Sequence, residues 1–568
     1  MDAYSMTCTP PALRHMSRIY QDLTSRHFQR VSANCTSLNP NNKQSIVQDE
    51  KTPHVGIIGA GIAGLRCADI LAQHGFQVTI LEGRDRIGGR LYQDRLANGQ
   101  TIDIGPNWIH GTKTNPILDI AKATGTAMGS WDSSSYVFDE EGTLYGLEEG
   151  EKHATMMWDI VQAAFKYSNK HTAEIDPGES LLDFFRTSLR ELIPETEDGS
   201  WQRKREVVLQ MADLWGAFVG SPVDRQSLKF FWLEECIEGE NLFCAGTYTK
   251  ILEHIAAPAL QTATIEYNTT VAQIHGRGAQ PEDGPVRVTL TTGEQRAFDH
   301  LVVTCPLGWL QKNPQAFDPP LPAPLTRAIN TIGYGCLEKV YIAFPRAFWL
   351  DPDPALGGRH MEGFAQWLAP AFAPDTNPAR WTIEVVELAS LAGPDSPHPT
   401  LLFYLYGAQS AHLVSALAAL GPDKDARDGY LRRFFAPYYT RLPNFRANDP
   451  DCRPTCTYAT SWLADDLAGN GSYANFQVGL ERGDRDIRTM REGWPGAGVW
   501  LAGEHTAPFV ALGTATGAYW SGESVGRRIA EVYGRRVTGS GGDGDGDGDN
   551  DNSARAEGTD SGEKVLVD

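Results

Sequence analysis

The stretch HVGIIGAGIAG, residues 54–64, decides how this chain begins to fold. Its first five residues form a short apolar run that suits a strand buried in a parallel sheet. Apolar residues then recur at helical spacing until Gly75, and residues 77–82 resume as a second strand. Strand, glycine turn, helix and strand fit within about thirty residues, which predicts a βαβ unit.

The glycines of this stretch have the spacing of a dinucleotide-binding turn. Gly59 permits the tight turn, Gly61 lets a diphosphate approach the backbone, and Gly64 lets the helix pack closely on the strand. The helix start adds free N–H groups and a positive dipole. Glu82 follows 23 residues after Gly59, where it can accept from both ribose hydroxyls of an adenosine and repel the extra phosphate of NADP. A dinucleotide site is predicted, and a merely glycine-rich turn is the alternative.

The residues after Glu82 indicate which dinucleotide is bound, and they favour FAD over NAD. Residues 83–90 read GRDRIGGR, and a nicotinamide enzyme has no standard use for the glycine pair at residues 88–89 and the three arginines here. Residues 55–90 resemble the FAD-binding opening of the flavin-dependent amine oxidase superfamily. In that family the glycine-glycine-arginine segment passes beside the flavin and the pyrophosphate. The resemblance implies cofactor contacts for four residues of this segment: Arg84, Gly88, Gly89 and Arg90.

The resemblance continues downstream in the order that the family requires. Residues 105–111, GPNWIHG, are similar to the segment at the flavin's face, and WIHG is the form seen in animal polyamine oxidases. Residues 335–340, GCLEKV, match the segment that carries the family's active-site lysine. Residues 471–473, GSY, look like its substrate-side motif, and residues 499–504, VWLAGE, resemble its closing flavin motif. By this resemblance, the expected cofactor contacts also include Trp108, Val271, Glu504 and Thr514.

Three residues are expected to serve the reaction. By the resemblance, Lys339 holds a water against flavin N5, and Tyr473 forms a wall of the substrate site. His110 would hydrogen-bond a substrate nitrogen, since a neutral imidazole accepts from an amine near physiological pH. Plain alternatives stay open, because Lys339 also suits a surface position on an alternating strand and His110 a satisfied core position. Residues 232–240 add four carboxylates that fit either distal ammonium groups or a solvated face.

The sequence departs from the family's pattern near its closing motif. Residues 513–518, GTATGA, predict a helix start whose small side chains admit the isoalloxazine ring and whose positive end stabilises charge near N1. Close helix packing needs the same small residues. Thr516 stands where the family usually has histidine, and Thr514 lies near the place of a second aromatic wall, which puts a two-sided aromatic cage in doubt. Monoamine oxidases attach flavin to a cysteine in this region, whereas the last cysteine here is Cys456, so the FAD is expected to be noncovalent.

Composition limits the remaining functions. The 568 residues are 41% hydrophobic and carry a net charge of −21, the opposite of the balance that a nucleic-acid binder shows. No apolar run is long enough to span a membrane. Nine cysteines without regular spacing favour a reducing compartment, expected to be the cytoplasm, with a peroxisome or other organelle left open. Neither the cysteine spacing nor the acidic tail completes a metal site, so no metal is predicted.

The predicted fold class is α/β, a split Rossmann-like FAD domain of the two-dinucleotide type with an inserted α+β substrate domain. The FAD domain is assigned to three segments: residues 53–130, 246–306 and 473–537. The substrate domain is assigned to two: residues 131–245 and 307–472. A poorly ordered extension at residues 1–52 and a disordered acidic tail at residues 538–568, rich in alternating Gly and Asp, are expected to flank them.

The resemblance implies an FAD-dependent amine oxidase of polyamine-oxidase type. A polyamine such as spermine, spermidine or an N-acetyl derivative would give a hydride to flavin N5, the imine would hydrolyse to amine and aldehyde, and O2 would leave as hydrogen peroxide. A histone-lysine demethylase of the same superfamily is one alternative, although the chain shows no long heptad insertion and no basic extension. A flavin dehydrogenase that does not use oxygen and a scaffold that binds FAD without catalysis are the others.

Overall fold

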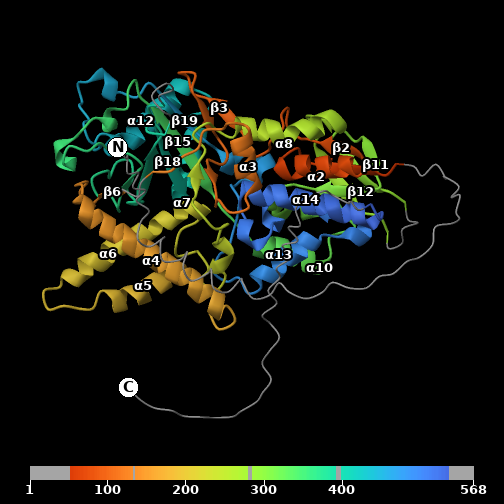
Figure 1. Cartoon of the computed structure of the whole chain (residues 1–568), viewed down its shortest axis with the longest axis horizontal. Coiled ribbons are helices and arrows are strands. Elements are labelled where there is room, and N and C mark those ends of the chain that lie inside the picture. Colours follow the sequence, from red (N-terminus) through yellow and green to blue (C-terminus); the bar gives the residue numbers. More distant parts are fainter. Residues whose placement is uncertain (1–51, 132–134, 279–283, 392–397, 536–568) are drawn as a thin grey trace, which may run out of the picture.

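The computed structural model describes four stretches of the chain: residues 52–131, 135–278, 284–391 and 398–535. Apart from Thr52, the predicted N-terminal extension and acidic tail lie outside these described residues. The described fold is mixed α/β, and its two large sheets lie in neighbouring halves of the molecule (Figure 1). None of the helices in these stretches is both long enough and apolar enough to cross a membrane.

One half is built on a parallel sheet. The predicted opening unit is confirmed, since strand β1 (His54–Ile58), helix α2 (Ile62–Gln73) and strand β2 (Gln77–Leu81) follow one another. All neighbouring strands run parallel, in the order β21-β12-β1-β2-β8. Ligands of such sheets bind beyond the carboxyl ends of the strands. The other three strands come from distant parts of the chain: β8 (Thr264–Glu266), β12 (His300–Val303) and β21 (Val499–Leu501).

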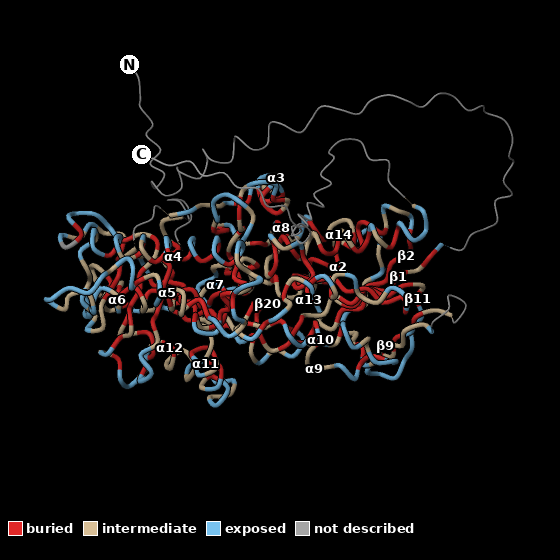
Figure 2. The backbone as a smooth tube through the Cα atoms, turned by 90° about the horizontal axis from the view of Figure 1, so that it is seen from below, coloured by how far each residue is buried: buried red, intermediate tan, exposed pale blue. Residues whose placement is uncertain are grey.

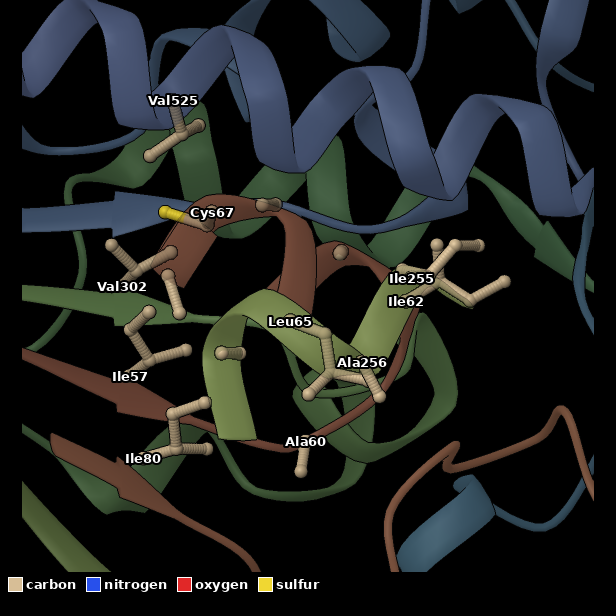
Figure 3. Packing of buried hydrophobic residues seen from close by; sticks show 14 of the residues in the cluster. Ile57, Ala60, Ile62, Leu65, Cys67, Ile80, Ile255, Ala256, Val302 and Val525 are labelled. Atoms are coloured by element: carbon tan, nitrogen blue, oxygen red, sulfur yellow. The ribbon is translucent and has the colours of Figure 1, made fainter. Parts of the chain in front are cut away.

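Helix α2 packs against the parallel sheet and against two further helices, α8 (Thr249–Thr262) and α14 (Ala515–Val532). Its buried side chains join those of the strands in one apolar cluster (Figure 3). The approach of α14 depends on Gly522, because a Cβ built there would lie 2.1 Å from the carbonyl oxygen of Ala63 on α2. Part of the small-residue pattern in α14 therefore serves helix packing.

A second apolar cluster covers the opposite face of the parallel sheet. It is completed by helices α10 (Ala323–Thr331) and α13 (Gly483–Glu492) and by a smaller sheet with the strand order β11-β10-β9-β13. Val271, a predicted cofactor contact, is the first residue of β9. The strands of the smaller sheet are β9 (Val271–His275), β10 (Val286–Leu290), β11 (Gln295–Phe298) and β13 (Phe317–Asp318).

The other half is built on a six-stranded sheet with the order β19-β15-β18-β17-β16-β6. Its neighbours are antiparallel except for β16 and β6. One face packs through aromatic and aliphatic side chains on helices α11 (Gly407–Ala419) and α12 (Lys424–Tyr439). The strands are β19 (Cys456–Ala459), β15 (Leu337–Ala343), β18 (Thr400–Tyr406), β17 (Ile383–Glu387), β16 (Phe364–Trp367) and β6 (Ser135–Phe138).

Three helices form a further layer of this half: α4 (Leu147–His171), α5 (Leu181–Leu192) and α6 (Ser200–Ala212). Their buried faces make a cluster of their own, in which the rings of Phe165 and Phe231 stack 4.2 Å apart. Figure 2 shows buried segments running through the interior of both halves, with exposed segments mainly on the outside. Each half therefore has a substantial core of its own, which gives the site between them fixed walls.

Candidate active site

A cavity of about 2070 Å³ is lined by residues of both halves. It exceeds the roughly 300–1,000 Å³ of most small-molecule sites, so a dinucleotide and a second ligand have room in it. Every residue predicted from the sequence as a site residue lines this cavity, with the exception of Gly64. The structure thus gathers segments that span more than four hundred positions of the sequence around one space.

The glycine loop between β1 and α2 forms part of the cavity wall. Gly59 has a φ of +104°, a conformation that favours glycine. A Cβ built on Gly61 would meet nothing nearer than the carbonyl oxygen of Gly88 at 3.9 Å, so the space above Gly61 is open. A Cβ on Gly64 would lie 2.1 Å from the carbonyl oxygen of Gly59, which explains why Gly64 packs and does not line. An open space beside a helix N-terminus fits a diphosphate.

Glu82, directly after β2, is held against this loop. Its side chain is buried, with Oε2 accepting from the N–H of Ala60 at 2.6 Å and Oε1 from the N–H of Arg84 at 2.8 Å. The second glycine segment is fixed to the same loop, because the N–H of Gly88 donates to the carbonyl oxygen of Ala60 at 2.8 Å. Gly88 and Gly89 both have positive φ, at +95° and +60°. The two glycine segments therefore form one cradle.

Two arginine–carboxylate pairs tie this cradle to distant segments. Arg84 donates through Nη2 to both carboxylate oxygens of Asp465, at 2.9 and 2.8 Å. Arg90 donates through Nη1 to Oε1 of Glu504 at 2.9 Å and to the carbonyl oxygen of Ser472 at 2.7 Å. Three of these residues were predicted to contact the cofactor, but neither pairing was predicted. No local pattern marks Asp465, which lies 381 residues from Arg84.

Some small residues at the start of α14 line the cavity, and others pack inside the protein. Thr514 caps the helix by accepting from the N–H of Gly517 at 3.0 Å. Thr516, which stands in the place of the family's histidine, is buried outside the cavity wall and donates to Oδ1 of Asn115 at 3.0 Å. The stretch therefore contributes both to the cavity wall and to packing, and the contact with the flavin ring stays a prediction. Four residues line the cavity: Gly513, Thr514, Ala515 and Ala518.

Lys339 lies on β15 with only 5% of its surface exposed, so the alternative of an ordinary surface lysine is wrong. Its Nζ lines the cavity region and donates to the carbonyl oxygens of Gly105 and, at 3.4 Å, Asp103. Burial lowers the pKa of this amine well below that of a free lysine, and the carboxyl of Asp103 opposes the shift. Lys339 is thus a buried amine of the cavity wall bonded to the segment before Trp108, and its role in holding a water stays a prediction.

Asp103 is a buried residue of this region that the sequence analysis missed. Its carboxylate accepts from the N–H of Tyr248 at 3.1 and 3.2 Å and from Nε2 of Gln93 at 2.7 Å. Burial raises the pKa of this carboxyl. The signal in the sequence is an acidic residue inside an alternating strand pattern just before the glycine of residue 105, and it is too common to single out.

The WIHG segment is held by a short pair of strands. Strand β5 (Trp108–Ile109) runs antiparallel to β7 (Leu242–Phe243), which brings His110 beside the acidic segment of residues 232–240. Burial lowers the pKa of His110, opposed by a hydrogen bond with the Asn241 side chain, and its Nδ1 has no hydrogen-bond partner in the described part of the chain. The described residues therefore satisfy only part of this imidazole, and its role toward a substrate nitrogen stays a prediction.

Aromatic residues form further walls of the cavity. Trp108 donates through Nε1 to the hydroxyl of Tyr404 at 3.2 Å, and Tyr404 donates in turn to Oδ1 of Asn107 at 3.2 Å. Tyr473 lines the cavity, and its hydroxyl donates to the carbonyl oxygen of Phe218. Burial raises the pKa of Tyr473 far above its usual value, so the hydroxyl stays neutral. Tyr404 was not predicted, because its place depends on the register of β18.

The four carboxylates of residues 232–240 do not act as a group. Glu234 lies in the cavity wall and accepts from the N–H of Phe476 at 3.2 Å, and burial raises its pKa to about 8. Glu235 is an exposed cavity residue. Glu238 pairs with Lys113 at the exposed rim and Glu240 accepts from the Ser130 hydroxyl, so the four carboxylates have different surroundings and recognition of ammonium groups stays a prediction.

Residues 62–530 match the family described as flavin containing amine oxidoreductase. Residues 20–101 also match the pyridine nucleotide-disulphide oxidoreductase family. Because the first match covers most of the sequence, the chain belongs to the flavin-containing amine oxidoreductase family. The resemblance drawn from the motifs is confirmed, and FAD is the cofactor, which the glycine cradle, Glu82 and the start of α14 fit.

Three curated relatives show where the chain stands within the family. It is 29% identical over 310 residues to probable polyamine oxidase 4 of Arabidopsis thaliana, covering 53% of this chain and 60% of the relative. It is 27% identical over 346 residues to the human peroxisomal N(1)-acetyl-spermine/spermidine oxidase, covering 53% and 63%. It is 28% identical over 310 residues to human lysine-specific histone demethylase 2, covering 53% and 36%. The matches thus span between about a third and less than two thirds of these relatives' own length.

Proposed function

We propose that the chain is an FAD-dependent oxidase of polyamines, acting on spermine, spermidine or their N-acetyl derivatives. The observation that carries the proposal is the shared cavity, whose wall includes both the dinucleotide cradle and the predicted reaction residues Lys339, His110 and Tyr473. When bound, FAD supplies a hydride acceptor at N5 and passes the two electrons to O2, which leaves as hydrogen peroxide. The oxidised substrate, an imine, is hydrolysed to an amine and an aldehyde.

The residues around the cavity would position the substrate and exclude water from the reacting atoms. Such a reaction needs an amine in its neutral form, because an ammonium has no lone pair to assist hydride departure. His110 lines the cavity, and its neutral imidazole would accept from a substrate N–H. Lys339 would hold the water that the imine consumes or assist reoxidation. Tyr473, fixed by its bond to Phe218, would form the wall against which the substrate lies.

The domain division is part of the same proposal. Residues 53–130, 246–306 and 473–537 would form the FAD domain, and their strands β1, β2, β8, β12 and β21 share the parallel sheet. Residues 131–245 and 307–472 would form the inserted substrate domain around the six-stranded sheet. The described cysteines are all free, which supports a reducing compartment such as the cytoplasm.

A histone-lysine demethylase is the second candidate, because the human demethylase relative is about as similar as the polyamine oxidases. Purified protein should be assayed for hydrogen peroxide with spermine, spermidine, their N-acetyl forms, a simple monoamine and a methyl-lysine peptide. Peroxide release with a polyamine supports the proposal, whereas release with the peptide alone supports the demethylase. Amine-dependent flavin reduction without peroxide in air would indicate a dehydrogenase, and no reduction by any compound would indicate a scaffold.

A further inference from the structure

A row of polar side chains crosses the six-stranded sheet, starting from Lys339. Lys339 on β15 lies opposite Tyr404 on β18. Tyr404 in turn lies opposite Glu384 on β17, and Glu384 lies opposite Gln366 on β16. Directly paired residues of neighbouring strands point to the same face, and all four residues line the cavity. The spacing of strands places Glu384 about 10 Å from Lys339 along this row.

The alternation of the strands confirms which face carries the row. The adjacent residues Val340, Phe403 and Val385 belong to the apolar cluster on the opposite face, which packs on α11 and α12. The row therefore lies on the cavity side of the sheet. Burying a carboxylate and a carboxamide in the middle of a sheet costs more free energy than burying apolar side chains at the same positions.

Glu384 is buried without a cationic partner. It is 7% exposed, and Nε2 of Gln366 donates to its Oε2 at 3.0 Å. Among the described residues no lysine, arginine or histidine pairs with it, and burial raises its pKa to about 7. Oε1 of Gln366 is also buried and has no hydrogen-bond partner in the described stretches. The site thus offers acceptor oxygens, and its described residues supply one amide donor and no cation.

An ammonium group of a ligand would provide the positive charge that the surroundings of Glu384 do not. It supplies several N–H donors and the positive charge that stabilises a carboxylate in an apolar cavity. Two other carboxylates of the cavity wall are differently placed, since Glu234 accepts from a backbone N–H and Glu238 pairs with Lys113 at the exposed rim. Glu384 is the acid that lies in line with Lys339 on the sheet.

We propose that Glu384, assisted by Gln366, binds a second ammonium group of a substrate whose other nitrogen is oxidised beside Lys339. The proposal rests on the proposed oxidation of amines and deepens it. It makes Glu384 a specificity residue that favours diamines and polyamines over monoamines of the same length.

The test compares 1,8-diaminooctane with octylamine, which differ by one amino group. In Glu384→Gln, a side chain of the same shape keeps an acceptor for Gln366 but loses the charge. We expect kcat/KM for the diamine to fall about ten- to a hundredfold, while kcat/KM for octylamine stays unchanged or rises. The control Glu148→Gln removes a charge at the cavity rim, where the side chain is 86% exposed and paired with Lys152, and should change neither value. An equal loss for both amines, or no loss for either, overturns the proposal.

Two further measurements keep the result decisive. Flavin content and melting temperature show whether Glu384→Gln is folded, and Glu384→Asp, which keeps the charge, should retain part of the diamine preference even if the glutamine variant is unstable. If the wild type oxidises neither amine, calorimetric titration with 1,8-diaminooctane decides the role of Glu384, while the peroxide assay with spermine, spermidine and their N-acetyl forms decides the proposed function separately. Binding that weakens at least tenfold in Glu384→Gln supports the proposal, and equal affinity or no binding to the wild type overturns it.

Discussion

At the scale of single residues, Gly61 and Gly64 show how one motif contains two different requirements. Gly61 has φ −74° and ψ 178°, which any residue adopts, and the space beside it is open. At Gly64 there is no room for a side chain larger than hydrogen, because a Cβ there would overlap the carbonyl oxygen of Gly59. The first glycine is thus free to serve a ligand, while the second is required by the fold.

Wild-type protein should carry FAD that acid precipitation releases intact, since no cysteine follows Cys456. Gly61→Val should fold but retain little or no FAD, because its side chain fills the space that the diphosphate needs. Gly64→Ala should instead lose about 1–3 kcal/mol of stability through overpacking. Flavin absorbance after gel filtration, with circular dichroism of each variant, separates the two effects. Flavin left in the washed acid pellet, or normal flavin content in Gly61→Val, would contradict this interpretation.

Lys339→Met should keep the fold and bound FAD, because Met retains an unbranched apolar stem while losing the charge and the donors. Turnover should fall by about tenfold to a thousandfold, equal to about 1.4 to 4 kcal/mol of transition-state stabilisation. Stopped-flow measurement of flavin reduction and of reoxidation assigns the loss to one half-reaction. Wild-type rates in both would show that Lys339 has a structural role alone.

Glu234 predicts a pH dependence of stability. Burial raises its pKa from 4.5 to about 8, so between these values the unfolded chain has released a proton that the folded protein keeps. The stabilisation from this proton is full at low pH and declines as pH rises through about 8. Glu234→Gln keeps an acceptor for Phe476 and removes the titration. The difference in melting temperature between Glu234→Gln and wild type should increase from about pH 5 to about pH 8 without added amine. The control Glu238→Gln, at an exposed position, should show no such increase. A difference that does not change with pH for either variant would contradict this prediction.

At the scale of elements, the sequence predicted what local patterns encode. The βαβ opening, strand β21 and the start of α14 follow from apolar periodicity and glycine placement, and all three are confirmed. The row from Lys339 to Gln366 could not be predicted from the sequence, because it depends on the register between strands that lie far apart along the chain. These strands are β15, β18, β17 and β16. Period-two patterns show that a residue faces one side, but not which residue lies opposite.

The contact of α14 with α2 gives a prediction at this scale. Gly522→Ala should lower stability by about 1–3 kcal/mol, because its Cβ would overlap the Ala63 carbonyl and push the helices apart. Gly429→Ala in α12, where the nearest atom to an added Cβ is a mobile arginine nitrogen at 3.5 Å, should be neutral or stabilising by up to about 1 kcal/mol. Urea unfolding of both variants tests this; if both variants gain stability alike, helix propensity and not the contact with Ala63 governs the site, and if both lose stability alike, the loss is not specific to that contact.

At the scale of the whole molecule, the site depends on pairings that join distant segments. Arg84 bonds Asp465 across 381 positions, and Arg90 bonds Glu504 across 414. Local motifs identified the predicted site residues that line the cavity, but they identified neither Asp465 nor Glu384. These two become visible in the folded chain, where Glu384 lines the cavity and Asp465 bonds Arg84 of its wall.

The central claim is that this cavity holds FAD and an amine together. The most direct test mixes the purified protein with spermine in the absence of oxygen, follows the flavin absorbance, and then readmits air. We expect the oxidised flavin band to bleach faster as pH rises and the amine loses its proton, and one hydrogen peroxide to form per flavin when air returns. A flavin that stays oxidised with spermine, spermidine and their N-acetyl forms at every pH would contradict the account.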